Sequence, residues 1–168
     1  MSKDNLTTQP SRRRLMLSAL IAAAVLILDQ GSKAWILNSV MQPPRVIEVT
    51  SFFNIVLAWN RGVSFGMFNS ESAYGPWLLT GLAIVIVVVL AVWLWKANTC
   101  LASLSIALVI GGAAGNVIDR LQYGAVVDFL DVHGFGYHWP AFNVADSAIC
   151  IGASILVLES LFRRGETS

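Results

Sequence analysis

Long apolar stretches dominate the chain, and polar residues are confined to their ends and to the segments between them. Four stretches carry few or no charges: 15–37, 77–95, 101–118 and 143–162. Each is long enough, at about 1.5 Å per helical residue, to cross a hydrocarbon layer of about 30 Å. The second contains no charged residue, whereas the first is interrupted only by Asp29 and Lys33. The pattern predicts an α-helical integral membrane protein with four transmembrane helices.

A different pattern lies between the first two spans. Segments 46–50 and 52–59 are rich in β-branched and aromatic residues, and they are bounded by prolines on one side and by Asn60, Arg61 and Gly62 on the other. This is typical of short strands between turns. We expect a small outward-facing β platform, lying on the membrane surface, between helices 1 and 2. Residues 12–164 are predicted to form one membrane domain, with a disordered tail at 1–11 and a short cytoplasmic tail at 165–168.

Composition and charge support a membrane protein and orient it. The chain of 168 residues is 56% hydrophobic and 12% charged, with a mean hydropathy of +0.67, whereas soluble domains carry about 25% charged residues. An N-terminal arginine cluster before an apolar run also fits a signal peptide, but no small-residue cleavage site follows it. Both termini are predicted to be cytoplasmic, because basic residues flank the spans on one side: Arg12, Arg13, Arg14, Lys96, Arg163 and Arg164.

Polar side chains gather at the opposite, outward ends of the spans. Ionisable residues at membrane depth are costly and usually functional. Because the middle of each span is apolar, a transporter is disfavoured, and we expect the chemistry at the outward interface. The polar residues at that level are Asp29, Lys33, Asn116, Asp119, Arg120, Asp128, Asp131, Asn143 and Asp146.

A pair of carboxylates is the favoured chemistry. Two carboxyl groups held close together cannot both ionise, and the resulting acid and base can hydrolyse an amide without a metal or cofactor. Asp146, at the start of the last span, is one candidate. Its partner is Asp128, which lies in an apolar segment, or Asp119 or Asp131. The alternative for Asp128 is a structural charge neutralised by Arg120.

Other arrangements have weaker support. Asp29 and Lys33 stand four residues apart on one helix face, so a supporting salt bridge is expected. His133 and His138 flank a flexible turn at 134–137 rather than a helix, so a metal site is not expected, and both should lie near the lipid headgroups. A lipid-binding or assembly subunit, with polar residues used only for packing, is the third class of function.

The chain resembles the bacterial lipoprotein signal peptidases, also called signal peptidase type II. Five blocks carry the resemblance: 29–33 (DQGSK), 60–65 (NRGVSF), 111–120 (GGAAGNVIDR), 126–129 (VVDF) and 142–147 (FNVADS). They extend from the first span into the last and leave only the tails outside.

The resemblance implies an aspartic endopeptidase of the bacterial inner membrane, with its active site on the outer, periplasmic side. It implies removal of signal peptides from prolipoproteins, just before a cysteine modified with diacylglycerol. It assigns catalysis to Asp128 and Asp146. Expected partners are these substrates, membrane lipid and globomycin-type inhibitors, with no cofactor, metal or nucleic acid, and the protein is expected to be a monomer. A lid at 60–68 could bend at Gly62 and Gly66. The supporting or substrate-binding residues are Asp29, Lys33, Asn60, Gly62, Asn116, Arg120 and Asn143.

Overall fold

A computed structural model describes residues 11–62 and 75–165 of the chain. Residues 1–10 of the predicted N-terminal tail and residues 166–168 lie outside the described residues. So does most of the segment predicted to act as a lid, including Gly66.

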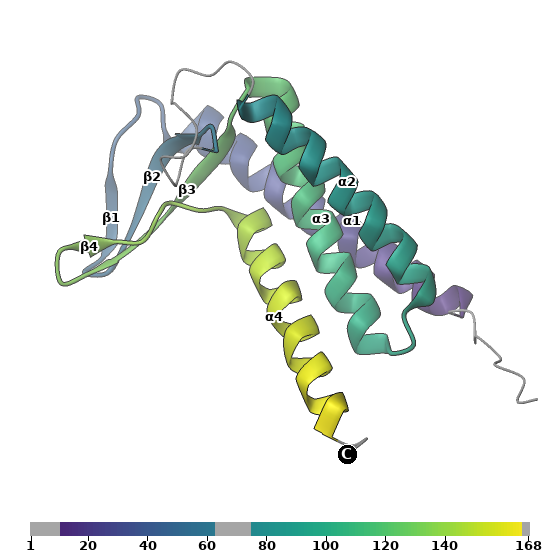
Figure 1. The fold of residues 1–168 in the computed structure, drawn as a ribbon. Helices are drawn as coiled ribbons and strands as arrows, with labels where there is room; N and C mark the ends of the chain where they lie inside the picture. Colours follow the sequence, from purple (N-terminus) through teal and green to yellow (C-terminus); the bar gives the residue numbers. More distant parts are fainter. Residues whose placement is uncertain (1–10, 63–74, 166–168) are drawn as a thin grey trace, which may run out of the picture.

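Four long helices form the body of the molecule (Figure 1). All four are long and apolar enough to cross a membrane, which confirms the predicted fold class. The third predicted span, 101–118, is shorter than the observed third helix, which continues to Tyr123. The last turns of this helix carry polar residues that face neighbouring segments, so the apolar pattern stopped before them. The helices are α1 (Arg12–Trp35), which continues as a π-helical turn (Ile36–Val40), α2 (Gly75–Lys96), α3 (Cys100–Tyr123) and α4 (Val144–Gly165).

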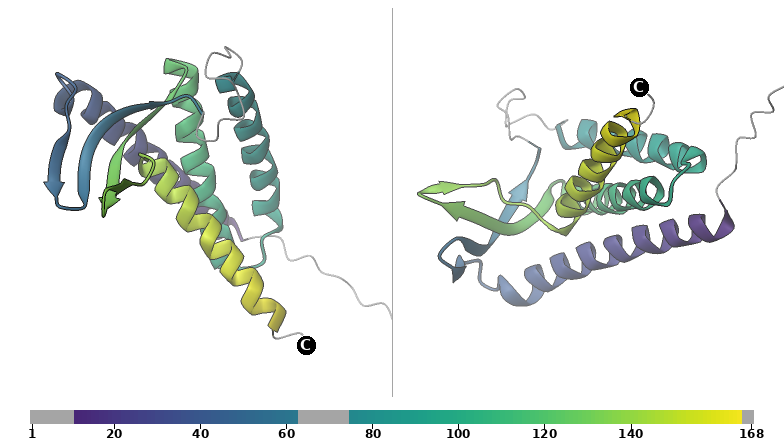
Figure 2. Two further views of the ribbon diagram at one scale, coloured as in Figure 1. Left: turned by 60° about the vertical axis from the view of Figure 1, so that its left-hand side comes forward. Right: turned by 90° about the horizontal axis from the view of Figure 1, so that it is seen from below.

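Helix α3 is central and packs against α1, α2 and α4 (Figure 2). Its run of small residues permits a close approach on two sides. A Cβ atom added at Gly111 would lie 2.6 Å from the Ala22 carbonyl oxygen of α1, and one at Gly112 would lie 2.5 Å from the Ala145 carbonyl oxygen of α4. Close backbone packing of this kind stabilises helix association in lipid, where no hydrophobic force acts between helices. It places the polar end of α3 directly beside the start of α4.

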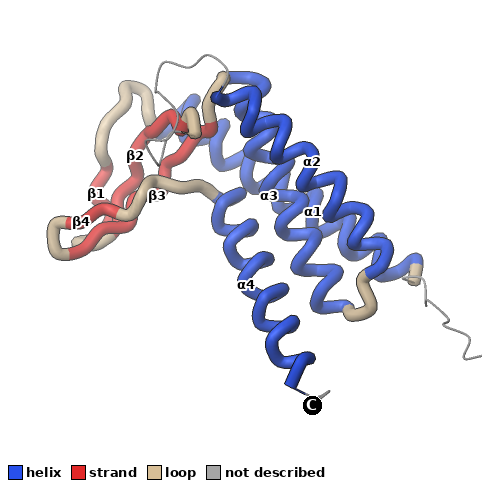
Figure 3. The backbone as a smooth tube through the Cα atoms, in the orientation of Figure 1, coloured by secondary structure: helices blue, strands red, loops and turns tan. Residues whose placement is uncertain are grey.

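A four-stranded antiparallel sheet lies at one end of the bundle (Figure 3). Its strands are β1 (Ile47–Thr50), β2 (Phe53–Asn60), β3 (Val126–Gly134) and β4 (Tyr137–His138), in that order across the sheet. The predicted platform between the first two helices is confirmed in β1 and β2. The sequence did not predict that β3 and β4, from the chain between α3 and α4, would complete the same sheet.

The pairing of β2 with β3 carries one candidate residue to the helices. Ala58 lies opposite Asp128, and Asn60 lies opposite Val126, beyond an irregularity that follows Ile55 in the register. The first four residues of β3 are all buried. This strand therefore lacks the alternation of polar and apolar positions by which a half-exposed strand is recognised.

The contact of α3 with α4 can be tested with a single methyl group. We expect Gly112→Ala to lower the free energy of unfolding by about 1–3 kcal/mol, because the added carbon meets a main-chain oxygen that cannot rotate away. Gly81→Ala in α2, where an added Cβ meets no atom of the described residues within 4 Å, is the matched control and should be neutral or slightly stabilising. Thermal unfolding of both variants in detergent measures the difference, and equal effects would contradict this account of the packing.

Candidate active site

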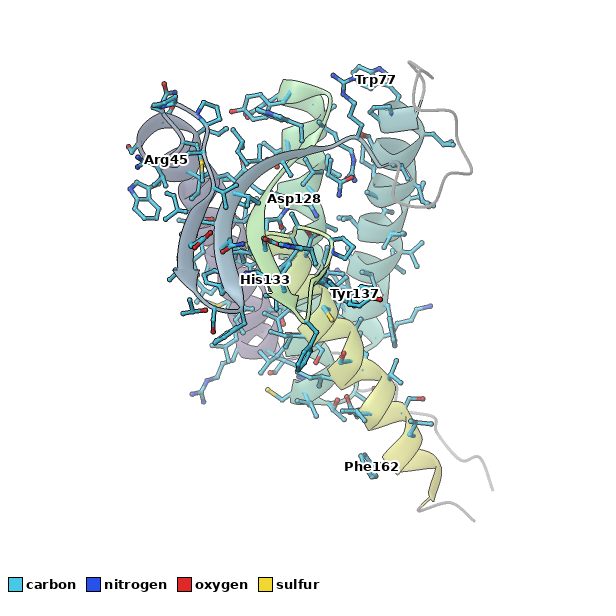
Figure 4. The ribbon with its side chains drawn as sticks, turned by 90° about the vertical axis from the view of Figure 1, so that its left-hand side faces the viewer. Arg45, Trp77, Asp128, His133, Tyr137 and Phe162 are labelled. Carbon is cyan, nitrogen blue, oxygen red and sulfur yellow. The ribbon has the colours of Figure 1, made fainter. Side chains whose placement is uncertain are left out.

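Asp128 and Asp146 reach the same place from different elements. Asp128 is the third residue of β3 and is 1% exposed, whereas Asp146 lies in the first turn of α4 and is half-buried. Figure 4 shows Asp128 on its strand, where the sheet meets the helices. One carboxylate of the predicted pair therefore comes from the beginning of a strand, and the other comes from the beginning of a helix.

Asn143 joins the two carboxylates. Its side-chain Nδ2 donates to Asp128 Oδ1 at 2.7 Å, and its main-chain N–H donates to Asp146 Oδ2 at 3.3 Å. In return, the Asp146 main-chain N–H donates to Asn143 Oδ1 at 2.9 Å. Asparagine is favoured before a helix because its side-chain oxygen accepts an N–H of the first turn, and a carboxylate three residues later can complete the reciprocal pair. The local sequence that starts α4 thus also positions both acids.

Two further amides complete the hydrogen bonding. Asn116 of α3 donates through Nδ2 to Asp146 Oδ1 at 2.8 Å, and Asn60 of β2 donates through Nδ2 to Asp128 Oδ2 at 2.9 Å. Each of the four carboxylate oxygens therefore accepts a hydrogen bond from an amide group. Among the described residues, no ion pair includes either acid. The alternative in which Arg120 neutralises Asp128 is not supported.

Arg120 lies beside the pair without forming an ion pair to it. Its Nη1 donates to the Asn116 carbonyl oxygen at 3.4 Å. Its Nε atom is buried and lacks an acceptor within the part of the chain that the structure describes. The guanidinium group therefore retains a donor next to the carboxylates.

Gly62 orients the amide of Asn60. The Gly62 N–H donates to Asn60 Oδ1 at 2.8 Å, which fixes the side-chain plane so that Nδ2 points to Asp128. Gly62 has φ +89°, in the left-handed region that favours glycine, and a Cβ atom there would collide with Leu79 of α2. The turn after β2 is thus part of the carboxylate environment.

The environment of Asp128 favours its neutral form. Burial raises the pKa of Asp128 from 3.8 to about 6, and the nearby negative charge of Asp146 adds to that increase. The hydrogen bonds from Asn60 and Asn143 act in the opposite direction. A carboxyl group with this pKa can take up and release a proton near neutral pH.

Asp131 lies in a different environment. Its carboxylate accepts a hydrogen bond from Asn54 Nδ2 at 3.0 Å and lies 2.9 Å from His138 Nδ1. Burial raises the pKa of Asp131, but the hydrogen bonds from His138 and Asn54 outweigh it and hold the pKa below its usual value. The rings of His133 and His138 stack with centroids 4.7 Å apart. The described residues contain no cluster of histidine, cysteine and acidic side chains that could hold a metal ion.

A buried network of ion pairs adjoins Asp128 and Asp146. The predicted salt bridge is confirmed, with Lys33 Nζ at 2.8 Å from Asp29 Oδ2. Lys33 is also 2.8 Å from Asp119 Oδ2 and donates to Asn116 Oδ1 at 3.2 Å. Gln30 Nε2 donates to both Asp29 and Asp119. Gln30 and Asp119 were not predicted to belong to this network, although Asp119 follows Asn116 by three residues and so shares its helix face.

A family model and many relatives match the chain. The model described as Signal peptidase (SPase) II matches residues 21–162. A protein named Lipoprotein signal peptidase from Ralstonia nicotianae is 47% identical over 82% of this chain and 80% of its own length. A protein of the same name from Rhodopseudomonas palustris (strain TIE-1) is 44% identical over 86% of this chain and 92% of its own.

Solved structures agree with these sequence matches. A bacterial membrane enzyme determined by the in meso method at 2.3 Å resolution has a TM-score of 0.78 and 32% identity, covering 92% of this chain and 93% of the other. A second, determined at 1.9 Å resolution, has a TM-score of 0.75 and 33% identity over 88% and 94% of the two chains. The chain therefore belongs to the signal peptidase II family of membrane proteases.

Proposed function

We propose that this protein is an aspartic endopeptidase that removes signal peptides from prolipoproteins, cutting just before a cysteine that carries diacylglycerol. The observation that carries the proposal is the placement of Asp128 and Asp146 on one shared asparagine, with neutral amides rather than cations at their oxygens. The substrate class is inferred from the name of the relatives, Lipoprotein signal peptidase.

The proposed mechanism uses one ionised and one protonated carboxyl group. The ionised group takes a proton from a water molecule, and the protonated group donates its proton to the scissile carbonyl oxygen. Attack of the water gives a tetrahedral intermediate, and return of a proton to the nitrogen releases the new amine. The raised pKa of Asp128 supports a protonated carboxyl group in the pair. The proton belongs to the coupled pair rather than to one residue.

Other polar groups have supporting roles in this proposal. Asn60, Asn116 and Asn143 orient the acids, and Gly62 orients Asn60. The buried Nε of Arg120, which has no acceptor among the described residues, is available to a substrate carbonyl group. No metal or cofactor takes part in these steps.

The proposed location is the bacterial inner membrane, with both termini in the cytoplasm and the site on the periplasmic side. The sheet, to which Asp128 belongs, lies at one end of the helices, and α4, with Asp146 in its first turn, runs from the side of the sheet toward the opposite end (Figure 1). At that opposite end, Arg14 Nη1 donates to the Ala97 carbonyl oxygen at 2.8 Å, so the start of α1 adjoins the α2–α3 turn. Basic residues on this side favour a cytoplasmic location.

The proposed substrate enters from the bilayer. Its acyl chains would lie against the helices. We expect globomycin-type cyclic peptides to compete for the same site and the protein to act as a monomer.

Catalysis by the pair predicts a specific loss of activity. We expect Asp128→Asn and Asp146→Asn each to lower the turnover of a diacylglyceryl-modified precursor by about 100- to 10,000-fold, because each removes a proton donor or acceptor. Asp131→Asn, a buried acid of the same strand outside the pair, is the matched control and should retain turnover. The assay uses purified protein and resolves precursor from product by mass. Normal cleavage by Asp128→Asn would leave a packing role for the acids and end the proposal.

The raised pKa of Asp128 predicts a pH-dependent stability difference between the wild-type protein and Asp128→Asn. In the folded wild type, Asp128 holds its proton up to a pKa of about 6, whereas in the unfolded chain it ionises near 3.8. The folded state therefore binds more protons in that window, so wild-type stability falls relative to the variant as pH rises from about 4 to about 6. The difference should reach about 3 kcal/mol at most. Thermal unfolding of both proteins across pH 4 to pH 8 measures it, and a pH-independent difference would contradict the shift.

A further inference from the structure

Three buried charged groups lie next to the carboxylate pair without touching it. Asp29, Lys33 and Asp119 are each no more than 2% exposed. Buried charges are costly unless every donor and acceptor is satisfied, and a network of this kind often gives no net stability compared with apolar packing. The contacts of these charged groups indicate a role other than stability.

Asp29 and Asp119 have the same kinds of partner. Asp29 and Asp119 each form an ion pair with the Lys33 ammonium group, and each accepts a hydrogen bond from Gln30 Nε2. Each also accepts one main-chain N–H from a segment of the active site. Lys33 Nζ also donates to Asn116 Oδ1 at 3.2 Å.

Asp29 and Asp119 each accept a main-chain N–H from the residue that precedes one of the catalytic acids. Asp29 Oδ1 accepts the N–H of Ala145 at 2.9 Å, and Ala145 directly precedes Asp146. Asp119 Oδ2 accepts the N–H of Val127 at 3.0 Å, and Val127 directly precedes Asp128. One ammonium group and one amide group thus connect the backbone just before one acid to the backbone just before the other.

We propose that Asp29, Gln30, Lys33 and Asp119 form a brace that sets the separation of the two acidic side chains. The brace acts through main-chain positions rather than through the acids themselves, so its members are positioning residues. This inference rests on the proposed catalytic role of Asp128 and Asp146. Gly115 is part of the geometry, because a Cβ atom there would collide with Asp29 Oδ2.

A fixed separation matters because the acids lie on segments that could otherwise move independently. One is in a strand of the sheet and the other is in the first turn of α4. Functional groups must be held within about 0.5 Å of the productive geometry, and a misplacement of about 1 Å can cost about 100-fold in rate. The separation also determines how strongly the two titrations are coupled.

Asp119→Asn tests the brace. The new side-chain amide must direct its NH₂ group either toward Gln30 Nε2 or toward Val127 N and Lys33 Nζ. In either case two donors face each other, and the contact on that side of residue 119 is lost. We expect kcat to fall about 100-fold with KM changed less than about threefold, because alignment and not binding is lost. The pH profile of kcat should become narrower, because acids that move apart interact less and their apparent pKa values converge.

A second test compares variants of both acids of the brace, Asp29 and Asp119. Asp29→Asn should produce the same narrowing of the pH profile of kcat. The double variant should lower kcat little more than either single variant, because both substitutions act on the same separation between the catalytic acids. Gln30→Leu removes a neutral member and keeps the three charges, so it provides a milder test if the acidic variants do not fold. It should lower kcat about tenfold and also narrow the profile.

Ser18→Ala is the matched control for a purely structural effect. It removes another buried contact between α1 and α3, the hydrogen bond from Ser18 Oγ to the Ser103 carbonyl oxygen at 3.3 Å. It should lower thermal stability without narrowing the pH profile. The brace is refuted if Asp119→Asn and Gln30→Leu also lose only stability while keeping wild-type kcat and pH profile. Turnover retained by Asp128→Asn would instead refute the proposed function, so the two failures are distinguishable.

Discussion

The hydrogen bonding of two poorly solvated carboxyl groups by neutral amides is the constraint on which the rest of the structure depends. A cation in contact with either acid would hold it ionised and remove its ability to exchange a proton. An amide donor satisfies a buried oxygen at a lower electrostatic cost and leaves the protonation state open. The three asparagines come from β2, α3 and the residue before α4. The sheet and the bundle must therefore be assembled before the site exists.

Helix α3 brings these parts together. Its glycines allow α1 and α4 to approach its backbone, and its last turns carry Asn116 and Asp119 to the level at which the sheet begins. Gly124 then ends the helix in the left-handed conformation, with its N–H bonded to the Arg120 carbonyl oxygen at 3.0 Å. The chain turns at once into β3, so Asp128 follows the polar end of the helix within a few residues.

Charged side chains lie near Asp128 and Asp146, but within the described part of the chain none forms an ion pair with them. Lys33 is paired with two acids, and its positive charge lowers the pKa of Asp128 less than burial raises it. Asp131, on the same strand, shows the opposite balance, since an imidazole and an amide hold the pKa of Asp131 low. Two aspartates three residues apart in one strand thus differ in their partners, and only the buried end of the strand meets the helices.

The sequence by itself determined the four spans, the short strands after the first span, the salt bridge of Asp29 with Lys33, and the concentration of polar residues at one level. These follow from hydropathy and from local spacing, which act within one helix or turn. The residue pattern alone left Asp128, Asp119 and Asp131 open as partners of Asp146, and the family resemblance pointed to Asp128. Tertiary structure distinguished their surroundings, because side-chain direction in β3 depends on its register with β2, more than sixty residues earlier in the chain. The position of Asp119 between Lys33 and Val127 likewise depends on how α1, α3 and β3 pack, which no local pattern specifies.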